Sequence, residues 1–138
     1  MYIRENIDNS KLRILSKEEG IPITELLLNK ICNLSKKENI NYTLLAVCPN
    51  SENVLIAALH SAKKAKTPIK FAATLNQVDI DGGYTGWTQN DLVKKIKEES
   101  SLIGYNGPII VAVDHGGPWV KDIQAIEKWE LNKAMNWI

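Results

Sequence analysis

The chain has 138 residues, of which 44% are apolar and 24% are charged. This length suits one modest domain and is too short for two. Lys and Arg number 17 against 16 Asp and Glu, so the formal charge is +1, and only Arg4 and Arg13 are arginines. Because phosphate and base recognition favour arginine forks and dense basic stripes, this composition argues against a nucleic-acid partner.

The cysteines and the first residues bear on the cellular compartment. Cys32 and Cys48 are too few for a disulfide framework or a paired metal knuckle, which suits a reducing compartment. The N-terminal residues lack the apolar core of a signal peptide, and no stretch reaches the roughly 18 apolar residues of a membrane span. We therefore expect a soluble, cytoplasmic protein with no membrane partner.

The first 41 residues stand apart from the rest of the pattern. Residues 1–20 are polar with little periodicity, and they predict an arm or a short helix. A helix is predicted from Thr24, its candidate cap, to Leu34, because apolar residues recur there at three- and four-residue spacing. These residues are Ile23, Leu27, Ile31 and Leu34. Residues 35–41 are polar and predict a connector.

Three short apolar runs later in the chain predict strands. They are Tyr42–Val47, Ile69–Leu75 and Pro108–Val113. A short, continuous apolar run is typical of a strand in a parallel sheet, and we expect the first strand to be buried on both faces.

Each predicted strand is followed by a helical pattern. Residues 51–66 carry an apolar stripe and end in lysines, which complement the helix dipole. A second helix is predicted from Thr88 to about Leu102, with Thr88 as N-cap and Asp91 as its capping-box partner. A third is predicted from residue 120 to the end, on the apolar positions Val120, Ile123, Ile126, Leu131, Ala134 and Ile138.

This order of elements predicts an α/β fold with parallel strands, because a helix separates each strand from the next. A doubly wound sheet and a β/α barrel both fit. A barrel is favoured because all three strands end in polar residues at the carboxyl edge, where barrels gather functional groups. We expect residues 1–41 to form an N-terminal helical arm. We expect residues 42–138 to form the first three βα units of a TIM barrel, which takes about 250 residues when complete.

Asp114 and His115 emerge side by side where the third strand ends. Successive strand residues point to opposite faces, so both side chains reach one cleft only if the strand stops here. Asp114 could then move a proton on a substrate, and His115 could bind a divalent metal through a ring nitrogen. The alternative is structural, with Asp114 capping the next turn and His115 bonded to a backbone carbonyl.

Three further residues at strand ends are candidates for substrate binding. The amides of Asn76 and Gln77 follow the second strand and could bond a sugar hydroxyl, or they could close the turn by bonding the backbone. Cys48 ends the first strand. A reactive thiolate there would need a positive neighbour or a helix N-terminus, and the alternative is a small buried apolar residue.

The loop after the second strand is rich in glycine. Residues 82–86 could line an anion nest, but they match neither the P-loop nor the dinucleotide-binding fingerprint. Tyr84 and Trp87 flank these glycines. They could form a sugar-stacking surface, or they could pin the loop to the body of the domain.

Three stretches of the sequence resemble one known family in their order and spacing. They are LLAVCPNSENVLIAAL, ATLNQVDIDGGYTGWTQNDL and VDHGGPW, and the resemblance covers about residues 44–120. The family is the D-tagatose-1,6-bisphosphate aldolase subunit of the Z type. The middle stretch is the most specific, because Asn76, Gln77 and Val78 are followed by a glycine-rich loop and Thr88.

The resemblance implies a TIM barrel longer than this chain. It also implies a non-catalytic, stabilising role beside a class II, zinc-dependent aldolase in galactitol, N-acetylgalactosamine or tagatose catabolism. Asp114 and His115 resemble the proton donor and first metal ligand of class II aldolases, and Asn76 and Gln77 match the family's amides at the second strand.

Two classes of function stay open, together with a third reading as a complete doubly wound ligand-binding module. The first is an accessory subunit that docks on a catalytic aldolase acting on a phosphorylated ketose. The second is an enzyme, either a metal-dependent ketose-phosphate 4-epimerase or an aldolase, with zinc as the expected metal. Such an enzyme needs about three protein ligands on its metal, and this chain offers one credible ligand, His115. We expect the accessory role, no activity from this chain alone, and a homo-oligomer as an option.

Overall fold

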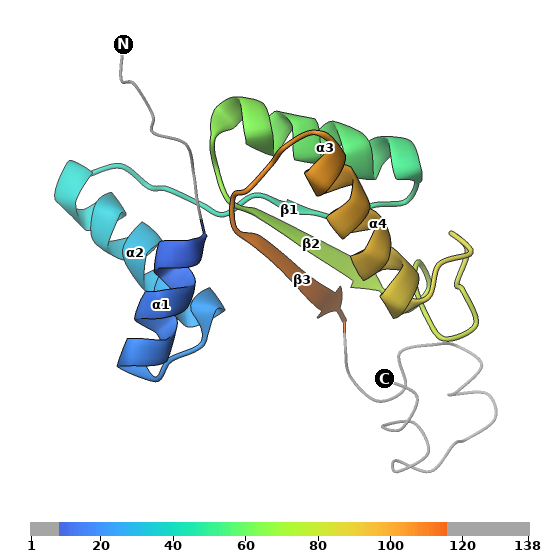
Figure 1. Ribbon diagram of the computed structural model, residues 1–138, viewed down its shortest axis with the longest axis horizontal. Helices are drawn as coiled ribbons and strands as arrows, with labels where there is room; N and C mark the ends of the chain where they lie inside the picture. Colours follow the sequence, from blue (N-terminus) through green and yellow to red (C-terminus); the bar gives the residue numbers. More distant parts are fainter. Residues whose placement is uncertain (1–8, 116–138) are drawn as a thin grey trace.

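A computed structural model gives the structure of the protein and describes residues 9–115. The elements of this part of the chain are α1 (Ser10–Glu19), α2 (Ile23–Glu38), β1 (Ala46–Val47), α3 (Glu52–Ala65), β2 (Ile69–Thr74), α4 (Gln89–Leu102) and β3 (Ile109–Asp114) (Figure 1). The helix expected from residue 120 onward lies outside the described residues. Within residues 9–115, no helix combines the length and apolar character needed to cross a bilayer.

The predicted N-terminal arm is a pair of packed helices. The chain leaves α1 through Gly20, which adopts a left-handed conformation with φ 68°, and Leu26 and Leu27 of α2 are buried. The predicted cap at Thr24 is wrong. Pro22 occupies the N-cap position instead, with a non-helical ψ of 144°, and the helix begins at Ile23, so Thr24 already lies inside its first turn. Figure 1 shows this helix pair beside the amino-terminal ends of the strands.

The strands form a parallel sheet, as predicted, and their order is β1-β2-β3. Alternate residues of β2, namely Ile69, Phe71 and Ala73, share one hydrophobic core with α3 and α4. Both helices therefore cover the same face of the sheet, as right-handed crossovers require when strand order advances one strand at a time. The members of the core from the two helices are Leu55, Ala58, Leu59, Ala62, Leu92 and Ile96.

The starts of α3 and α4 are capped by side chains. Ser51 Oγ accepts a hydrogen bond from Val54 N at 3.4 Å at the start of α3. At the start of α4 the predicted capping box is confirmed, since Thr88 Oγ1 accepts from Asp91 N at 3.2 Å and Asp91 Oδ2 accepts from Thr88 N at 2.9 Å. The hydrogen bonds that Thr88 donates lower the pKa of Asp91 below its usual value.

The expectation of a six-residue first strand buried on both faces is wrong. Only Ala46 and Val47 form β1, and Leu45 is 50% exposed. The register explains this difference, because Ala46 pairs with Lys70 and β2 begins at Ile69. Residues 42–44 thus precede the first residue of the neighbouring strand and have no ladder to join.

The loop that joins β2 to α4 is held by its own hydrogen bonds. Val78 and Trp87 form an isolated bridge, and Asp79 N donates to Trp87 O at 3.2 Å. Across the loop, Thr85 Oγ1 donates to Gln77 O at 2.6 Å. The loop therefore occupies a fixed position beyond the end of β2, where Figure 1 shows it beside the start of α4.

Gly83 brings the loop backbone against residues 76 and 77. Its φ is 51°, and a Cβ at this position would lie 2.5 Å from Gln77 O and 2.7 Å from Asn76 O. Gly86 also has a left-handed φ, 74°, but a Cβ there would meet nothing within 4 Å. A side chain at Gly86 would therefore meet only the energetic cost of the left-handed backbone conformation. A side chain at Gly83 would meet that cost and a steric clash with the backbone of residues 76 and 77.

We predict that Gly83→Ala destabilises the fold much more than Gly86→Ala. Both substitutions cost about 1–2 kcal/mol for a left-handed alanine, but only Gly83→Ala forces backbone atoms apart. Urea unfolding of the two variants measures the difference. Equal losses in the free energy of unfolding would contradict the close approach described for Gly83.

A buried tyrosine, Tyr105, links the residues that precede β2 and β3. Tyr105 OH donates to Thr67 O at 2.7 Å, and Pro108 O lies 3.3 Å away. Thr67 precedes β2 and Pro108 precedes β3, so this hydroxyl joins the starts of the two longest strands. Burial raises the pKa of Tyr105 to about 12.

We predict that Tyr105 makes the fold sensitive to alkali. A raised pKa means that the folded state favours the neutral phenol, so this contribution is complete below pH 10 and is lost as pH rises towards about 12. Tyr105→Phe should cost about 1 kcal/mol at pH 8 and flatten the decline above pH 10. Urea unfolding across this range is the measurement, with Tyr84→Phe, at a 64% exposed residue, as the control at pH 8. If the free energy of unfolding of Tyr105→Phe fell above pH 10 as steeply as that of the unaltered protein, the role given to Tyr105 would be wrong.

Candidate functional site

The candidate site lies at the carboxyl edge of the sheet. The register pairs Thr74, the last residue of β2, with Asp114, the last residue of β3. Cys48 follows β1, Asn76 and Gln77 follow β2, and His115 follows β3. The five candidate residues named from the sequence therefore all stand at one edge, as parallel strands dictate, and Figure 1 shows the tips of β2 and β3 side by side there.

Asp114 and His115 are in direct contact. His115 Nδ1 lies 3.2 Å from Asp114 Oδ2. His115 has a left-handed φ of 55°, so the alternation of side chains along the strand breaks at this residue. The condition set by the sequence, that the strand must end here for both side chains to meet, is fulfilled.

This contact divides the roles of the two imidazole nitrogens. A proton on Nδ1 donated to the Asp114 carboxylate leaves Nε2 with its lone pair available. The histidine side chain is 83% exposed and the aspartate side chain 42% exposed, so both are accessible to a ligand. His115 Nε2 can therefore reach a ligand while Nδ1 faces Asp114.

The fit of a metal ion to this edge is incomplete. Among residues 9–115, no three side chains of His, Cys, Asp or Glu gather in a way that could hold a metal ion. A catalytic zinc needs about three protein ligands, and His115 is the one credible ligand at this edge among the described residues. These described residues alone do not build such a centre.

Gln77 closes the end of β2. Its Oε1 accepts from Thr74 N at 3.0 Å and lies 3.4 Å from Thr74 Oγ1. Lys70 N donates to Leu45 O of the β1 side, so by alternation the N–H of Thr74 faces the same side, beyond the last residue of β1. Gln77 thus supplies an acceptor where the neighbouring strand has ended.

The remaining polar group of Gln77 is its amide nitrogen. The residue is 8% exposed, and Nε2 has no hydrogen-bond partner within residues 9–115. A buried N–H without a partner is costly, so this group is a candidate donor to a ligand oxygen. Of the two roles that the sequence left open for Gln77, the structure shows the structural one, in which the side chain closes the turn by bonding the backbone.

Asn76 and Cys48 are both exposed at this edge. The backbone oxygen of Asn76 accepts a hydrogen bond from Tyr84 N at 2.9 Å, and the residue is exposed. The alternative of a buried, apolar Cys48 is wrong, because β1 ends one residue earlier and the buried residue is Pro49. The Cys48 thiol lies three residues before Ser51, the N-cap of α3.

Asp79 is a site residue that the sequence analysis did not name. It is fully buried, and its Oδ1 accepts from Ile80 N at 2.7 Å and from Gln89 Nε2 at 3.3 Å. This carboxylate ties the loop to the first residue of α4. An aspartate between the apolar residues Val78 and Ile80 was the available signal.

Trp87 and Tyr84 of the same loop have different surroundings. Trp87 packs against the core, and Lys95 Nζ lies 5.5 Å from its ring centroid. Lys95 also pairs with Glu52 of α3 at 3.0 Å. Trp87 therefore pins the loop to the body, whereas Tyr84 is 64% exposed at the edge and remains open for stacking.

Comparison with known proteins identifies the family. Residues 28–137 match the family described as D-tagatose-1,6-bisphosphate aldolase subunit GatZ/KbaZ-like. Among solved structures, the chain is similar to a probable tagatose 6 phosphate kinase from Sinorhizobium meliloti 1021, at 29% identity and a TM-score of 0.54. The similarity covers 70% of this chain and 24% of that one, so the chain spans about a quarter of this relative. Because the family match extends over most of its length, the chain belongs to the D-tagatose-1,6-bisphosphate aldolase subunit GatZ/KbaZ-like family.

Proposed function

We propose that this chain supplies the first three strand–helix units of a β/α barrel in a tagatose-bisphosphate aldolase subunit. The monotonic parallel order and the placement of α3 and α4 on one face support this, since each successive unit of a barrel repeats that arrangement. The face of β2 opposite the helices carries Lys70, Ala72 and Thr74, and it would line the barrel interior.

The proposed role is to stabilise a catalytic partner, a class II aldolase subunit. The observation that carries this proposal is the match of residues 28–137 to a family of aldolase subunits. Holding such a partner in its active form needs a folded surface rather than chemistry of its own. We place the protein in the cytoplasm with its partner and its phosphorylated ketose.

A phosphorylated ketose is the substrate class that fits the carboxyl edge. The family is named for D-tagatose 1,6-bisphosphate, and the similar solved structure is named for tagatose 6 phosphate. Gln77 Nε2 and the Asn76 amide would donate to sugar hydroxyls, with Cys48 lining the same edge. These three residues come from the ends of two neighbouring strands, so one small ligand can contact all of them.

A second candidate, favoured by the Asp114–His115 contact, is an enzyme in its own right. Asp114 would move a proton on the substrate, as in an aldolase or a ketose-phosphate 4-epimerase. His115 Nε2 would be one ligand of a divalent metal, zinc by the family resemblance, with the other ligands supplied from outside residues 9–115.

One experiment decides between these functions. We predict that the catalytic aldolase subunit keeps its activity several-fold longer at elevated temperature when this protein is present, and that this protein alone with zinc does not cleave D-tagatose 1,6-bisphosphate. A partner half-life unchanged by this protein would contradict the stabilising role.

The second candidate predicts the opposite result for the protein alone. It requires turnover without the partner and a loss of about 10²–10⁴-fold in rate on Asp114→Asn. Glu98→Gln on α4, which removes an exposed carboxylate away from the carboxyl edge, is the matched control and should keep full activity.

A further inference from the structure

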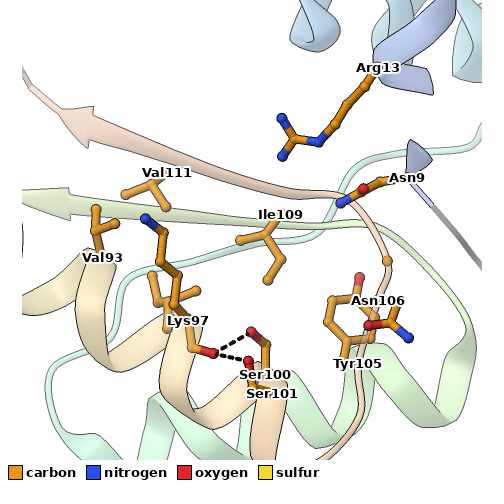
Figure 2. Close-up of a pocket in the computed structure, with 12 residues that line it drawn as sticks. Asn9, Arg13, Val93, Lys97, Ser100, Ser101, Tyr105, Asn106, Ile109 and Val111 are labelled. Atoms are coloured by element: carbon orange, nitrogen blue, oxygen red, sulfur yellow. Dashed lines mark hydrogen bonds between the residues drawn. The ribbon is translucent and has the colours of Figure 1, made fainter. Parts of the chain in front are cut away.

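The connection between α4 and β3 contains an asparagine followed by a glycine. Asn106 and Gly107 form the one Asn-Gly pair in the sequence. Asn106 is exposed, and Figure 2 shows it beside Tyr105 at the turn that leads into β3. Within residues 9–115, its side chain makes no hydrogen bond. The side-chain amide is therefore free to rotate towards the backbone that follows it.

The backbone on both sides of this pair is held by hydrogen bonds, whereas the pair is not. Tyr105 N donates to Ser100 O at 2.8 Å, and Pro108 O accepts from Ile69 N at 3.1 Å. Among the described residues, Gly107 N has no hydrogen-bond acceptor. A hydrogen bond keeps the proton on an amide nitrogen and holds the peptide in place. Its absence leaves this nitrogen able to attack a neighbouring carbonyl carbon.

A second pair of the same chemical kind is held by the fold. Asp81 and Gly82 form the one Asp-Gly pair in the sequence, and such a pair closes the same five-membered ring. Gly82 N, however, donates to Asp79 O at 2.9 Å. The loop around it is also tied to residues 76 and 77 by hydrogen bonds from residues 84 and 85. The contrast makes the connection before β3, rather than the glycine-rich loop, the reactive segment.

We propose that Asn106 is a site of spontaneous deamidation and isoaspartate formation. The nitrogen of Gly107 attacks Cγ of Asn106, so an N–Cγ bond forms and the bond from Cγ to the side-chain nitrogen breaks. Ammonia leaves and carries away the proton of the Gly107 amide. Water then opens the succinimide ring. Addition at Cγ gives aspartate, and addition at the main-chain carbonyl carbon gives isoaspartate, in which the backbone runs through Cβ and Cγ.

The glycine of the reactive pair is required by packing. A Cβ at Gly107 would overlap the hydroxyl and the ring of Tyr105. A side chain after the asparagine would slow ring closure by crowding the attacking nitrogen, and here the tyrosine excludes any such side chain. The residue that joins the starts of β2 and β3 therefore also keeps the reactive pair in the sequence.

Isoaspartate would loosen the link that Tyr105 makes. It inserts one methylene, about 1.5 Å of chain, between Tyr105 and Pro108. The Tyr105 hydroxyl donates to Thr67 O at 2.7 Å and lies 3.3 Å from Pro108 O. The insertion moves one of these acceptors relative to the other, so the hydroxyl cannot keep both contacts. The modification therefore weakens the connection between the starts of β2 and β3.

Aspartate at the same position would have a milder effect. Asn106 lines a hollow of about 380 Å³, drawn in Figure 2, whose lining also includes Val93, Val111, Arg13 and Lys97. None of the described residues that line this hollow is acidic. Deamidation to aspartate adds a carboxylate on this cationic side of the sheet and leaves the backbone unchanged. The two products therefore differ in their effect on stability.

Incubation of the full 138-residue chain at neutral pH tests the site. Trypsin then releases residues 98–121, which contain Asn106 and no other asparagine or glutamine. We expect this segment to gain one mass unit in the folded chain at a rate within about tenfold of that in the free peptide, because no hydrogen bond must open first. Methylation by an isoaspartyl methyltransferase identifies the isoaspartate. Residues 71–94, which carry Asp81 and Gly82, should form isoaspartate far more slowly in the folded chain than in urea.

Two outcomes would overturn the proposal. A mass gain in the folded chain that is more than about tenfold slower than in the free peptide would show that the fold shields the pair. Asn106→Gln is the matched control, since its longer side chain must close a six-membered ring and should give no isoaspartate in residues 98–121. Isoaspartate there at an undiminished rate would place the reaction at another residue.

Melting temperatures give an independent measurement. Aged chain fractionated to enrich isoaspartate should melt about 4 °C below the unmodified chain, because a hydrogen bond of Tyr105 is lost. Asn106→Asp carries the same charge on an unaltered backbone and should melt within about 1 °C of the unmodified chain. Equal melting temperatures for the isoaspartate form and Asn106→Asp would contradict the proposed loss of the Tyr105 link.

Discussion

The pairing of Thr74 with Asp114 is the constraint on which the candidate site depends. This register brings the last residues of β2 and β3 level with each other, and the turns that follow begin from that line. Gln77 then folds back to accept the N–H of Thr74 at 3.0 Å, which fixes the start of the loop beyond β2. A slip of one residue in the register would move Asp114 to the helix-covered face, away from the other candidate residues of the carboxyl edge.

The two faces of the sheet have separate tasks. Ile69, Phe71 and Ala73 join the core with α3 and α4, and this side supplies the apolar burial that holds the unit together. Lys70 and Thr74 stand on the other face, together with Asp114. Stability and chemistry can therefore vary independently on the two faces of the sheet.

The parts of the fold that depend on local sequence could be predicted, and the parts that depend on distant contacts could not. Continuous apolar runs and the Thr88 capping box marked β2, β3 and α4 to within a residue or two. The length of β1 depends on where β2 begins, more than twenty residues later. The burial of Asp79 depends on Gln89, ten residues further on, which becomes its partner only when the loop closes.

Amide resonances in a ¹H–¹⁵N spectrum during titration with D-tagatose 1,6-bisphosphate test most directly whether the carboxyl edge is the working face. We expect the largest shifts at the Gln77 side-chain amide and at the backbone amides of Thr74 and His115, with Val93 and Val111 unchanged. Shifts confined to Val93 and Val111, or no shifts at the strand ends at saturating ligand, would contradict this account.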